Sequence, residues 1–354
     1  MMLPRLTAVA VLALAGLACG RADAATWCVS TGSELYQALL GSSLNSESDV
    51  IRLETGTYAS GLPEGFTASI AGGGLELSGG WSGGCVFRSR SARSTIDGGY
   101  LRPGLRISGS SSAPRTVRIT QLAFIRGVGN EYGGLSVSGT GSGDLAVEIE
   151  RCRFHDNTNT DPDDTIGGGL YVNADDVSVL GNLFTDNHAG VGGGAAGLTC
   201  FSGLGAVGNN TVVGNTVAFG QANRTGGITV GGSCLWEVAN NILWDNEGYD
   251  LSIPADLATL RHNNLDDLGG VAAAGSSGNI AVDPQFVSAG ILRLQRSSPL
   301  VDAGLNETFL GLPQYSYDGG IRIAGPRIDI GAYELDILLA HGFDPTFTID
   351  DERP

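Results

Sequence analysis

Three aspartates occupy matching points of a repeated phrase in the middle of the chain, and two histidines flank them. They are Asp156, Asp186 and Asp245, with His155 and His188 beside them. Carboxylates and imidazoles in one row are suited to binding hydroxyl groups, moving a proton or holding a cation. We therefore predict that these five side chains line one face of the fold and form a binding surface. The alternative is a column of solvated turn residues that binds nothing.

The aspartates belong to a short phrase that occurs four times and closes with asparagine each time. The closing residues are Asn157, Asn187, Asn215 and Asn246, at spacings of 30, 28 and 31 residues. A period of this length indicates a solenoid, in which each repeat is one coil stacked on the preceding coil. Asparagines at equivalent points would stack and hydrogen-bond along the solenoid. We therefore predict a structural role for them.

The segments between the asparagines have the pattern of β-strands. Residues 145–150 and 177–180 alternate apolar and polar side chains, which places one face inward and the other outward. The chain also contains 56 glycines, which are costly inside helices and disfavour a helical solenoid. The sequence predicts an all-β, single-stranded, right-handed parallel β-helix with a short N-terminal capping helix over residues 33–40. We also expect Phe154, Phe184, Val212 and Leu243 to form an inward apolar stack.

The chain divides into five segments within one elongated domain. Residues 1–24 contain an apolar run and a small-residue cleavage pattern, which are typical of a signal peptide. Residues 25–98 are expected to form the cap and the first coils, and residues 99–282 the regular coils. Residues 283–335 are expected to form a C-terminal module that closes the solenoid, and residues 336–354 form an acidic tail.

The predicted location is outside the cell, either secreted or on the outer surface. Cys19 lies in a loose match to a lipoprotein processing site, but Gly16 departs from that pattern, so ordinary cleavage is favoured over lipidation. No other segment is long and apolar enough to form a transmembrane helix.

Five cysteines follow the predicted cleavage point, and export favours disulfides. Cys200 and Cys234 lie at nearly equivalent points of neighbouring repeats, so we expect them to be bridged. Cys28 and Cys85 are the other expected pair. Cys152 stands where other repeats have an asparagine, which predicts a buried free thiol.

The charge of the chain limits its partners. The formal net charge is -17, and the 20 basic side chains are all arginines. This balance disfavours nucleic acid, an anionic membrane surface and, without bridging metal ions, a polyanionic polysaccharide. The absence of lysine excludes Schiff-base chemistry and a phosphate-binding loop with its lysine. We predict a monomer that binds a polysaccharide or another cell-surface component, and such partners are compatible with the charge of the chain.

One acidic loop suggests a cofactor. Residues 156–164 contain four aspartates and two asparagines, and Ca²⁺ takes six to eight oxygen ligands of this kind. Asp161, Asp163 and Asp164 are the candidate calcium ligands. The spacing lacks the central glycine and the closing glutamate of an EF-hand loop. The alternative is a solvated acidic loop without a metal ion.

The end of the chain resembles the C-terminal module of bacterial β-helix proteins called choice-of-anchor Q proteins. The resemblance rests on an ordered set of short elements at residues 283–286, 292–294, 298–304, 318–319, 322 and 329–334. It implies the pectate-lyase-like right-handed β-helix superfamily and export, but not one particular activity. Arg322, Asp302 and Asp329 are expected to pair and to cap turns in this module.

We predict an exported, non-catalytic scaffold whose β-helix binds glycans or partner molecules. The alternative is a polysaccharide lyase or a glycoside hydrolase, and a third interpretation is a structural spacer. A hydrolase of this fold needs two carboxylates that face each other across the scissile bond. The sequence alone assigns no catalytic residue.

Overall fold

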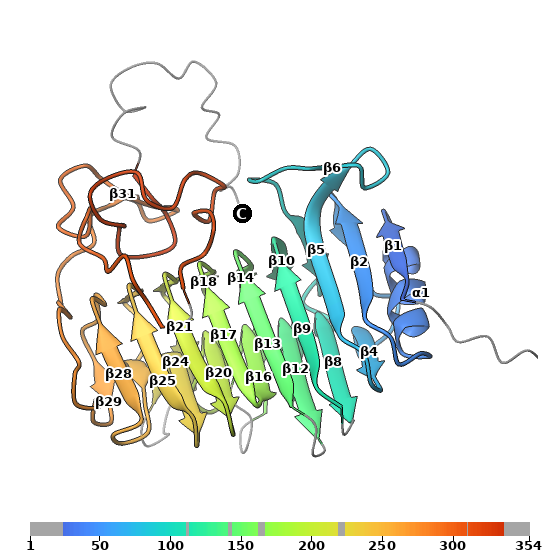
Figure 1. The fold of residues 1–354 in the computed structure, drawn as a ribbon, viewed down its shortest axis with the longest axis horizontal. Helices are drawn as coiled ribbons and strands as arrows, with labels where there is room; N and C mark the ends of the chain where they lie inside the picture. Colours follow the sequence, from blue (N-terminus) through green and yellow to red (C-terminus); the bar gives the residue numbers. More distant parts are fainter. Residues whose placement is uncertain are drawn as a thin grey trace, which may run out of the picture.

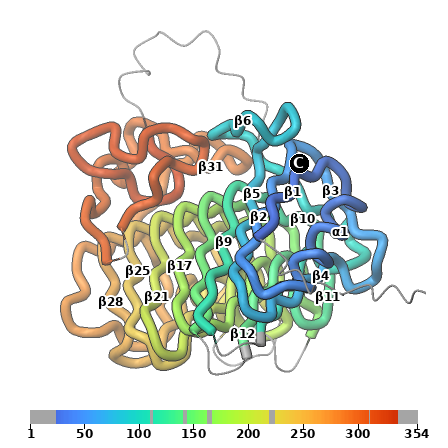
Figure 2. The backbone as a smooth tube through the Cα atoms, turned by 45° about the vertical axis from the view of Figure 1, so that its right-hand side comes forward, coloured from blue at the N-terminus to red at the C-terminus, as the bar shows by residue number. Residues whose placement is uncertain are grey.

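The computed structural model describes residues 24–110, 113–140, 144–161, 167–218, 224–309 and 311–335. Apart from one helix, the described elements are short strands that wind around a single axis (Figure 1). Strands from successive coils pair in parallel, and Figure 2 shows these coils as stacked turns. The predicted right-handed parallel β-helix is confirmed. The predicted acidic tail, and the predicted signal peptide apart from its last residue, lie outside the described residues.

Sheet A is the longest of the sheets that run along the solenoid. Its strands are β1 (Thr26–Val29), β2 (Asp49–Glu54), β5 (Leu75–Ser82), β9 (Arg115–Thr120), β13 (Leu145–Glu150), β17 (Asp176–Leu180), β21 (Leu204–Gly208), β25 (Leu235–Ala239) and β28 (Ala258–Arg261). The short strand β6 (Phe87–Arg88) pairs in antiparallel fashion with the last two residues of β5, Trp81 and Ser82.

Sheet B follows sheet A in each coil, after a tight corner. Its strands are β3 (Thr57–Tyr58), β7 (Ser94–Asp97), β10 (Leu122–Ile125), β14 (Arg153–His155), β18 (Leu183–Thr185), β22 (Thr211–Val213) and β26 (Ile242–Trp244). A second corner leads to sheet D, whose described strands are β11 (Val128–Gly129), β15 (Thr158–Asn159), β19 (His188–Ala189) and β23 (Thr216–Val217).

Sheet C completes each coil and leads back to sheet A. Its strands are β4 (Phe66–Ile70), β8 (Leu105–Ser110), β12 (Leu135–Thr140), β16 (Leu170–Ala174), β20 (Ala196–Cys200), β24 (Thr225–Gly232), β27 (Tyr249–Ser252) and β29 (Leu268–Gly269). Beyond the last coil, β30 (Phe286–Ser288) and β31 (Ile291–Leu294) form a separate antiparallel pair.

The core is built from equivalent side chains that stack from coil to coil. Phe124, Phe154 and Phe184 are in register, and their ring centroids are 5.3 and 4.7 Å apart. Val212 and Leu243 continue this row and are fully buried. The inward apolar stack predicted from the repeat is confirmed.

Two columns of buried asparagines run along the inner side of the corners. In the column between sheets B and D, each side-chain amide donates to the carbonyl oxygen of the next asparagine, at 2.9 Å from Asn157 to Asn187 and from Asn187 to Asn215. The same amides also donate to backbone carbonyl groups of the preceding coil. These bonds satisfy buried polar groups that the turns would otherwise leave unpaired. The structural role predicted for this column therefore agrees with its contacts.

The second column lies at the corner between sheets A and B. Asn182, Asn210, Asn241 and Asn263 form the same kind of ladder. Cys152 stands at its head, and its backbone N–H donates to Asn182 Oδ1 at 2.8 Å. Cys152 is a buried free thiol, as predicted, and burial raises its pKa to about 12. The thiol is therefore protonated at physiological pH and a poor nucleophile.

The N-terminal end of the solenoid is covered by the helix α1 (Gly32–Ser42) (Figure 1). Its own side chains Leu35 and Leu39 are fully buried against the solenoid. The helix begins one residue before the predicted start at residue 33, because Thr31 is the N-cap and forms a reciprocal capping box with Glu34. No helix in the described part of the chain has the length and apolar character needed to cross a membrane.

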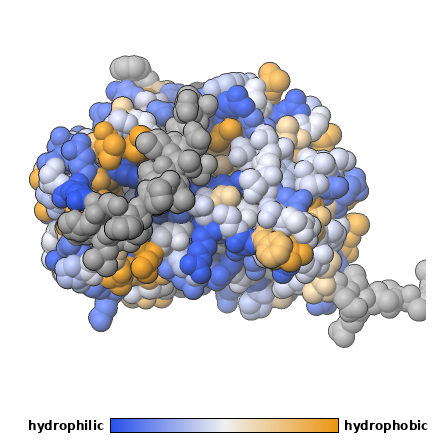
Figure 3. Space-filling model, turned by 90° about the horizontal axis from the view of Figure 1, so that it is seen from above, coloured by the Kyte–Doolittle hydropathy of each residue, from blue (hydrophilic) through white to orange (hydrophobic). Residues whose placement is uncertain are grey.

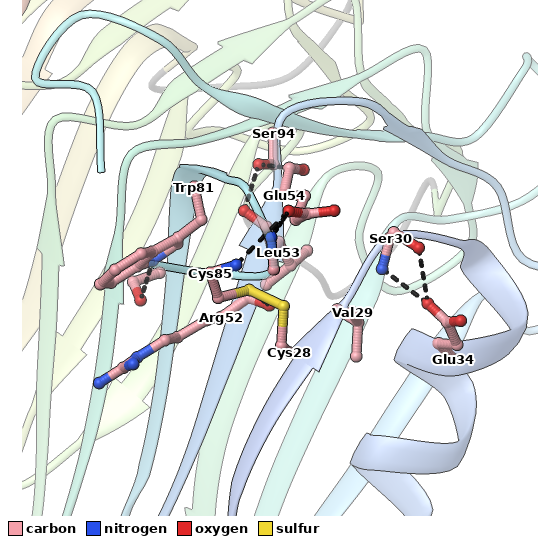
Figure 4. Close-up of a disulfide and its surroundings, with 12 residues drawn as sticks. Cys28, Val29, Ser30, Glu34, Arg52, Leu53, Glu54, Trp81, Cys85 and Ser94 are labelled. Atoms are coloured by element: carbon pink, nitrogen blue, oxygen red, sulfur yellow. Dashed lines mark hydrogen bonds between the residues drawn. A yellow bond between two sulfur atoms is a disulfide. The ribbon is translucent and has the colours of Figure 1, made fainter. Parts of the chain in front are cut away.

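The two predicted disulfides are present. Cys28–Cys85 joins β1 to the turn between β5 and β6 (Figure 4), and Cys200–Cys234 joins the end of β20 to the turn after β24. Their Cα–Cα distances of 5.7 and 5.4 Å are ordinary for disulfides. The first bridge links β1, next to the helical cap, to the hairpin formed by β5 and β6. The second bridge links neighbouring coils.

The C-terminal module, residues 283–335, does not simply close the last coil as expected. It folds back along the solenoid and lies over the outer face of sheet B (Figures 1 and 2). Tyr317 and Tyr333 pack with Leu183, while Leu300 and Ile330 pack with Ile242. The reason is that β18, β22 and β26 carry apolar side chains on their outer as well as their inner face. The resulting surface, seen from above, is mostly hydrophilic with separate apolar patches (Figure 3).

Candidate functional site

Asp156, Asp186 and Asp245 occupy the same point of the coil, directly after a strand of sheet B. The structure therefore brings all three to the corner between sheets B and D, hereafter the BD corner. Their backbone φ angles are 56, 57 and 56°, in the left-handed region that aspartate tolerates better than most residues. Gly214, with φ 69°, takes the same point in the coil between Asp186 and Asp245 and interrupts the row. Turn geometry therefore accounts for part of this repetition.

The two histidines lie beside these aspartates but have different partners. His155 Nδ1 is 2.9 Å from Thr185 Oγ1 and 3.3 Å from Asp186 Oδ2, on the next coil. His188 Nδ1 is 2.9 Å from Thr216 Oγ1. Burial lowers the pKa of His188, so its imidazole is neutral near pH 7. His155 therefore contacts an aspartate of the row, whereas His188 lies beside the row.

Sequence reasoning missed three side chains that extend this surface toward the N-terminus. The hydroxyl of Tyr100 donates to Asp156 Oδ2. Arg126 takes the corner position one coil before Asp156, forms an ion pair with Asp97, and has its guanidinium 5.7 Å from the Tyr100 ring centroid. The hydrogen bond to the Asp156 carboxylate raises the pKa of Tyr100, which keeps the phenol protonated as a donor. No repeat signal marks Tyr100, because it lies in an irregular turn.

The arrangement of carboxylates and imidazoles at the BD corner is not a ready-made metal site. Among the residues that the structure describes, one group of three potential ligands has its ligand atoms within 4.8 Å of one another, and it consists of Cys28, Glu54 and Cys85. The two cysteines of that group are joined in a disulfide. The BD-corner side chains instead contact hydroxyl groups and one another.

The structure describes only one of the three predicted calcium ligands. Asp163 and Asp164 lie outside the described residues. Asp161 is described, and its backbone N–H donates to Asn159 Oδ1 at 2.9 Å.

The sequence model of the right handed beta helix region matches residues 84–302. The chain belongs to this right-handed β-helix family. The matched segment begins in the turn after β5 and ends within the C-terminal module, so it includes all the coils that carry the BD corner. Searches of the curated proteins and of the solved structures found no match.

In this right-handed β-helix protein, the corner between sheets A and B provides a useful comparison. It too has left-handed residues in successive coils, but the chain itself covers them. Asn240 forms two hydrogen bonds with the backbone of Leu305, at 2.7 and 3.1 Å, and His262 Nδ1 is 2.9 Å from the carbonyl oxygen of Ala303. Gln121 donates to backbone carbonyl groups of the loop after β6. Corner side chains of this fold are thus well suited to binding extended chains.

Within the described residues, no backbone segment hydrogen-bonds to the carboxylates of Asp156 and Asp186 at the BD corner, whose partners are the side chains of Tyr100 and His155. Asp186 is exposed, and its neighbours Thr185 and Asp156 are half-exposed. Hydroxyl, carboxylate and imidazole groups alternate there and can donate as well as accept hydrogen bonds. The chemistry that this surface supports best is reversible hydrogen bonding to an extended polar ligand.

Proposed function

We propose that this right-handed β-helix protein is an exported scaffold that binds an uncharged polysaccharide at the BD corner. The observation that carries this proposal is the row formed by Tyr100, Asp156, His155, Asp186 and His188, which is open to solvent in successive coils. Coils repeat at about 4.8 Å, so an extended ligand can meet equivalent groups repeatedly. Sugar hydroxyls are suited to such groups because they both donate and accept hydrogen bonds.

The charge of the protein favours a neutral ligand over an acidic one. The chain has a formal net charge of -17. Arg126, the arginine of the BD corner, is already paired with Asp97. A polyanion would therefore meet uncompensated carboxylates at Asp156 and Asp186, and like charges disfavour binding.

Two features support export. Both disulfide pairs are formed, and disulfides persist mainly in oxidising compartments. The predicted signal peptide at residues 1–24 supplies a route to such a compartment. The proposal therefore places the protein outside the cell, secreted or on the outer surface, where polysaccharides are encountered.

The test is binding of the purified mature protein to a panel of neutral and acidic polysaccharides, measured by affinity electrophoresis and calorimetry. We expect binding to at least one neutral polysaccharide. The double variant Asp156→Asn, Asp186→Asn should weaken it at least tenfold, because the altered amides no longer accept hydrogen bonds on both side-chain oxygens. Asp144→Asn is the matched control, since Asp144 is an exposed aspartate away from the BD corner.

Equal affinity of the double variant and the wild type would show that the ligand binds away from the BD corner. Binding to acidic polysaccharides alone would contradict the proposed ligand class. Failure to bind any member of the panel would favour the structural-spacer interpretation. Thermal melting of each variant shows whether a loss of affinity comes from a loss of folding.

A further inference from the structure

The outer face of sheet A carries a second cluster of polar side chains, on a different side of the coil from the BD corner. Parallel pairing aligns these residues in two rows across neighbouring strands. The rows are Glu76, Arg118 and Glu148, and Ser78, Thr120 and Glu150. Strands of a sheet lie about 4.8 Å apart, so members of a row are direct neighbours.

Two carboxylates of this cluster come from one strand and share its outer face. Glu148 and Glu150 are two residues apart in β13, and both are half-exposed. At about 3.4 Å per residue, their attachment points are roughly 7 Å apart. Their side chains leave the sheet in the same direction, so the carboxyl groups can take up a similar separation.

The surroundings of the two carboxylates differ. Arg118 Nη2 is 2.5 Å from Glu148 Oε2, so the carboxylate of Glu148 has a cationic partner. No hydrogen bond or ion pair from the described parts of the chain reaches the carboxylate of Glu150. Burial raises the pKa of Glu150, although the charges of Arg151, Arg118 and Arg88 partly oppose this effect. One carboxyl group is thus paired with an arginine, and the other has no such partner and a raised pKa.

Arg88 provides a fixed cation beside Glu150. Its Nε donates to the carbonyl oxygen of Gly79 at 3.1 Å, and its Nη2 donates to Thr120 Oγ1 at 2.6 Å. Thr120 is the direct neighbour of Glu150 in the next strand. The guanidinium is therefore held next to the unpartnered carboxyl group and can donate to a ligand bound there.

Trp81 borders the cluster on the side of β5. Its ring is half-exposed and close to two arginines, with the guanidinium of Arg52 at 4.6 Å and that of Arg88 at 5.6 Å from the ring centroid (Figure 4 shows Trp81 and Arg52). Its Nε1 donates to Ser78 Oγ at 3.0 Å, which fixes the plane of the ring. The Cys28–Cys85 disulfide anchors the hairpin that carries Trp81 and Arg88. The surface around Glu150 therefore combines an aromatic edge with hydrogen-bond donors, as carbohydrate sites do.

We propose that Glu150 and Glu148 form an acid and base pair that hydrolyses a glycosidic bond of a neutral polysaccharide with inversion of configuration. Inverting hydrolases hold their two carboxyl groups roughly 6.5–9.5 Å apart, which leaves room for a water molecule. The spacing within β13 fits this range. The proposal is independent of ligand binding at the BD corner, because it uses a different face of the coil.

The proposed reaction consumes one water molecule. The protonated carboxyl group of Glu150 donates its proton to the glycosidic oxygen, and the bond from that oxygen to the anomeric carbon breaks. The ionised carboxylate of Glu148 takes a proton from water, whose oxygen forms the new bond to the anomeric carbon. Exchange with solvent then returns a proton to Glu150 and removes one from Glu148. Arg118 holds the carboxylate of Glu148 in an ion pair, and Arg88 donates to hydroxyl groups of the sugar.

The test uses the full mature protein and a panel of neutral polysaccharides, with release of reducing ends as the readout. Glu150→Gln and Glu148→Gln preserve side-chain size and remove the acid and the base. Each should lower turnover at least 100-fold, as expected when a general acid or base is lost. Glu47→Gln is the control, because Glu47 is an exposed glutamate outside this cluster and its substitution should leave turnover unchanged.

Two further readouts separate this mechanism from a structural effect. NMR of the first product should show the inverted anomeric configuration. The wild type should have a bell-shaped pH profile whose alkaline limb is lost in Glu150→Gln, because that limb reports deprotonation of the acid. A panel that releases no reducing ends, a retained configuration, or full activity of Glu150→Gln would each overturn the proposal. Loss of ligand binding at the BD corner would instead lower the affinity for the polysaccharide and leave turnover unchanged.

Discussion

Asn187 donates a hydrogen bond from Nδ2 to Oδ1 of Asn215 on the next coil, at 2.9 Å, and both side chains are fully buried. The same Nδ2 donates to the carbonyl oxygen of Phe154, at 2.9 Å. Asn187 Oδ1 in turn accepts from the backbone and the side chain of Asn157. One side chain therefore connects three successive coils at the BD corner.

The first prediction follows from this connection. Asn187→Ala should lower the free energy of unfolding by about 2–4 kcal/mol, because several buried donors and acceptors lose their partner. Chemical denaturation measures the change. Asn130→Ala is the control, since Asn130 is exposed and its substitution should cost well under 1 kcal/mol. Unchanged stability of Asn187→Ala would show that the ladder does not hold the coils together.

The second prediction concerns the Cys200–Cys234 disulfide. Replacing both cysteines by serine should lower stability by roughly 3–4 kcal/mol, because the bridge closes a loop with a sequence separation of 34 residues. Peptide mapping of unreduced protein from an oxidising compartment should find the cross-linked peptide. Recovery of both cysteines as free thiols from such a preparation would refute the pairing.

The third prediction is a pH dependence of the C-terminal module. Burial raises the pKa of Glu334 to about 7 from its usual 4.5, although its carboxylate accepts from two backbone N–H groups and lies 3.6 Å from Arg322. The folded state thus favours the protonated form. The stabilisation is complete below pH 4.5 and is lost as the pH rises through 7, amounting to at most about 3 kcal/mol.

Unfolding at several pH values between 4 and 8 tests this pH dependence. Glu334→Gln should flatten the profile above pH 5 because its side chain cannot ionise. Glu47→Gln, at an exposed position, should leave the wild-type profile unchanged. A wild-type profile that rises between pH 5 and 7 would show that the ion pair with Arg322 outweighs burial.

The fourth prediction concerns calcium. If Asp161, Asp163 and Asp164 bind Ca²⁺ in the native state, the melting temperature should rise with the logarithm of the Ca²⁺ concentration above saturation. The triple variant with asparagine at these three positions should lose this dependence. Identical wild-type melting curves in excess Ca²⁺ and in chelator would identify the segment as a solvated acidic loop.

The sequence alone was sufficient to predict the coil. Solenoids repeat locally, so Asn157 and Asn187, or Phe154 and Phe184, reveal their stacking through spacing alone. The period-two pattern of residues 145–150 likewise predicts which side chains are buried. The BD corner could be predicted for the same reason, since Asp156 and Asp186 recur with the repeat.

The C-terminal module was predicted as a segment, but its position was not. Val213 and Trp244 are apolar at positions that face outward, in register with the polar Thr185 and His155. This loss of alternation signals a covered face, but it does not say which segment covers it. The covering residues lie far away in the sequence, and their contacts with Leu183 and Ile242 obey no repeat.

The Glu148–Glu150 cluster also needed the tertiary structure. Spacing places these two carboxylates on one face of a strand, but Arg88 and Trp81 come from an irregular hairpin some sixty residues earlier. Parallel pairing of β5, β9 and β13 brings them together. The sequence determined the coil, its ladders and its disulfide pairs, because neighbouring repeats interact locally. Only the tertiary structure decided which outer faces are covered and which are open, because those contacts join segments outside the repeat.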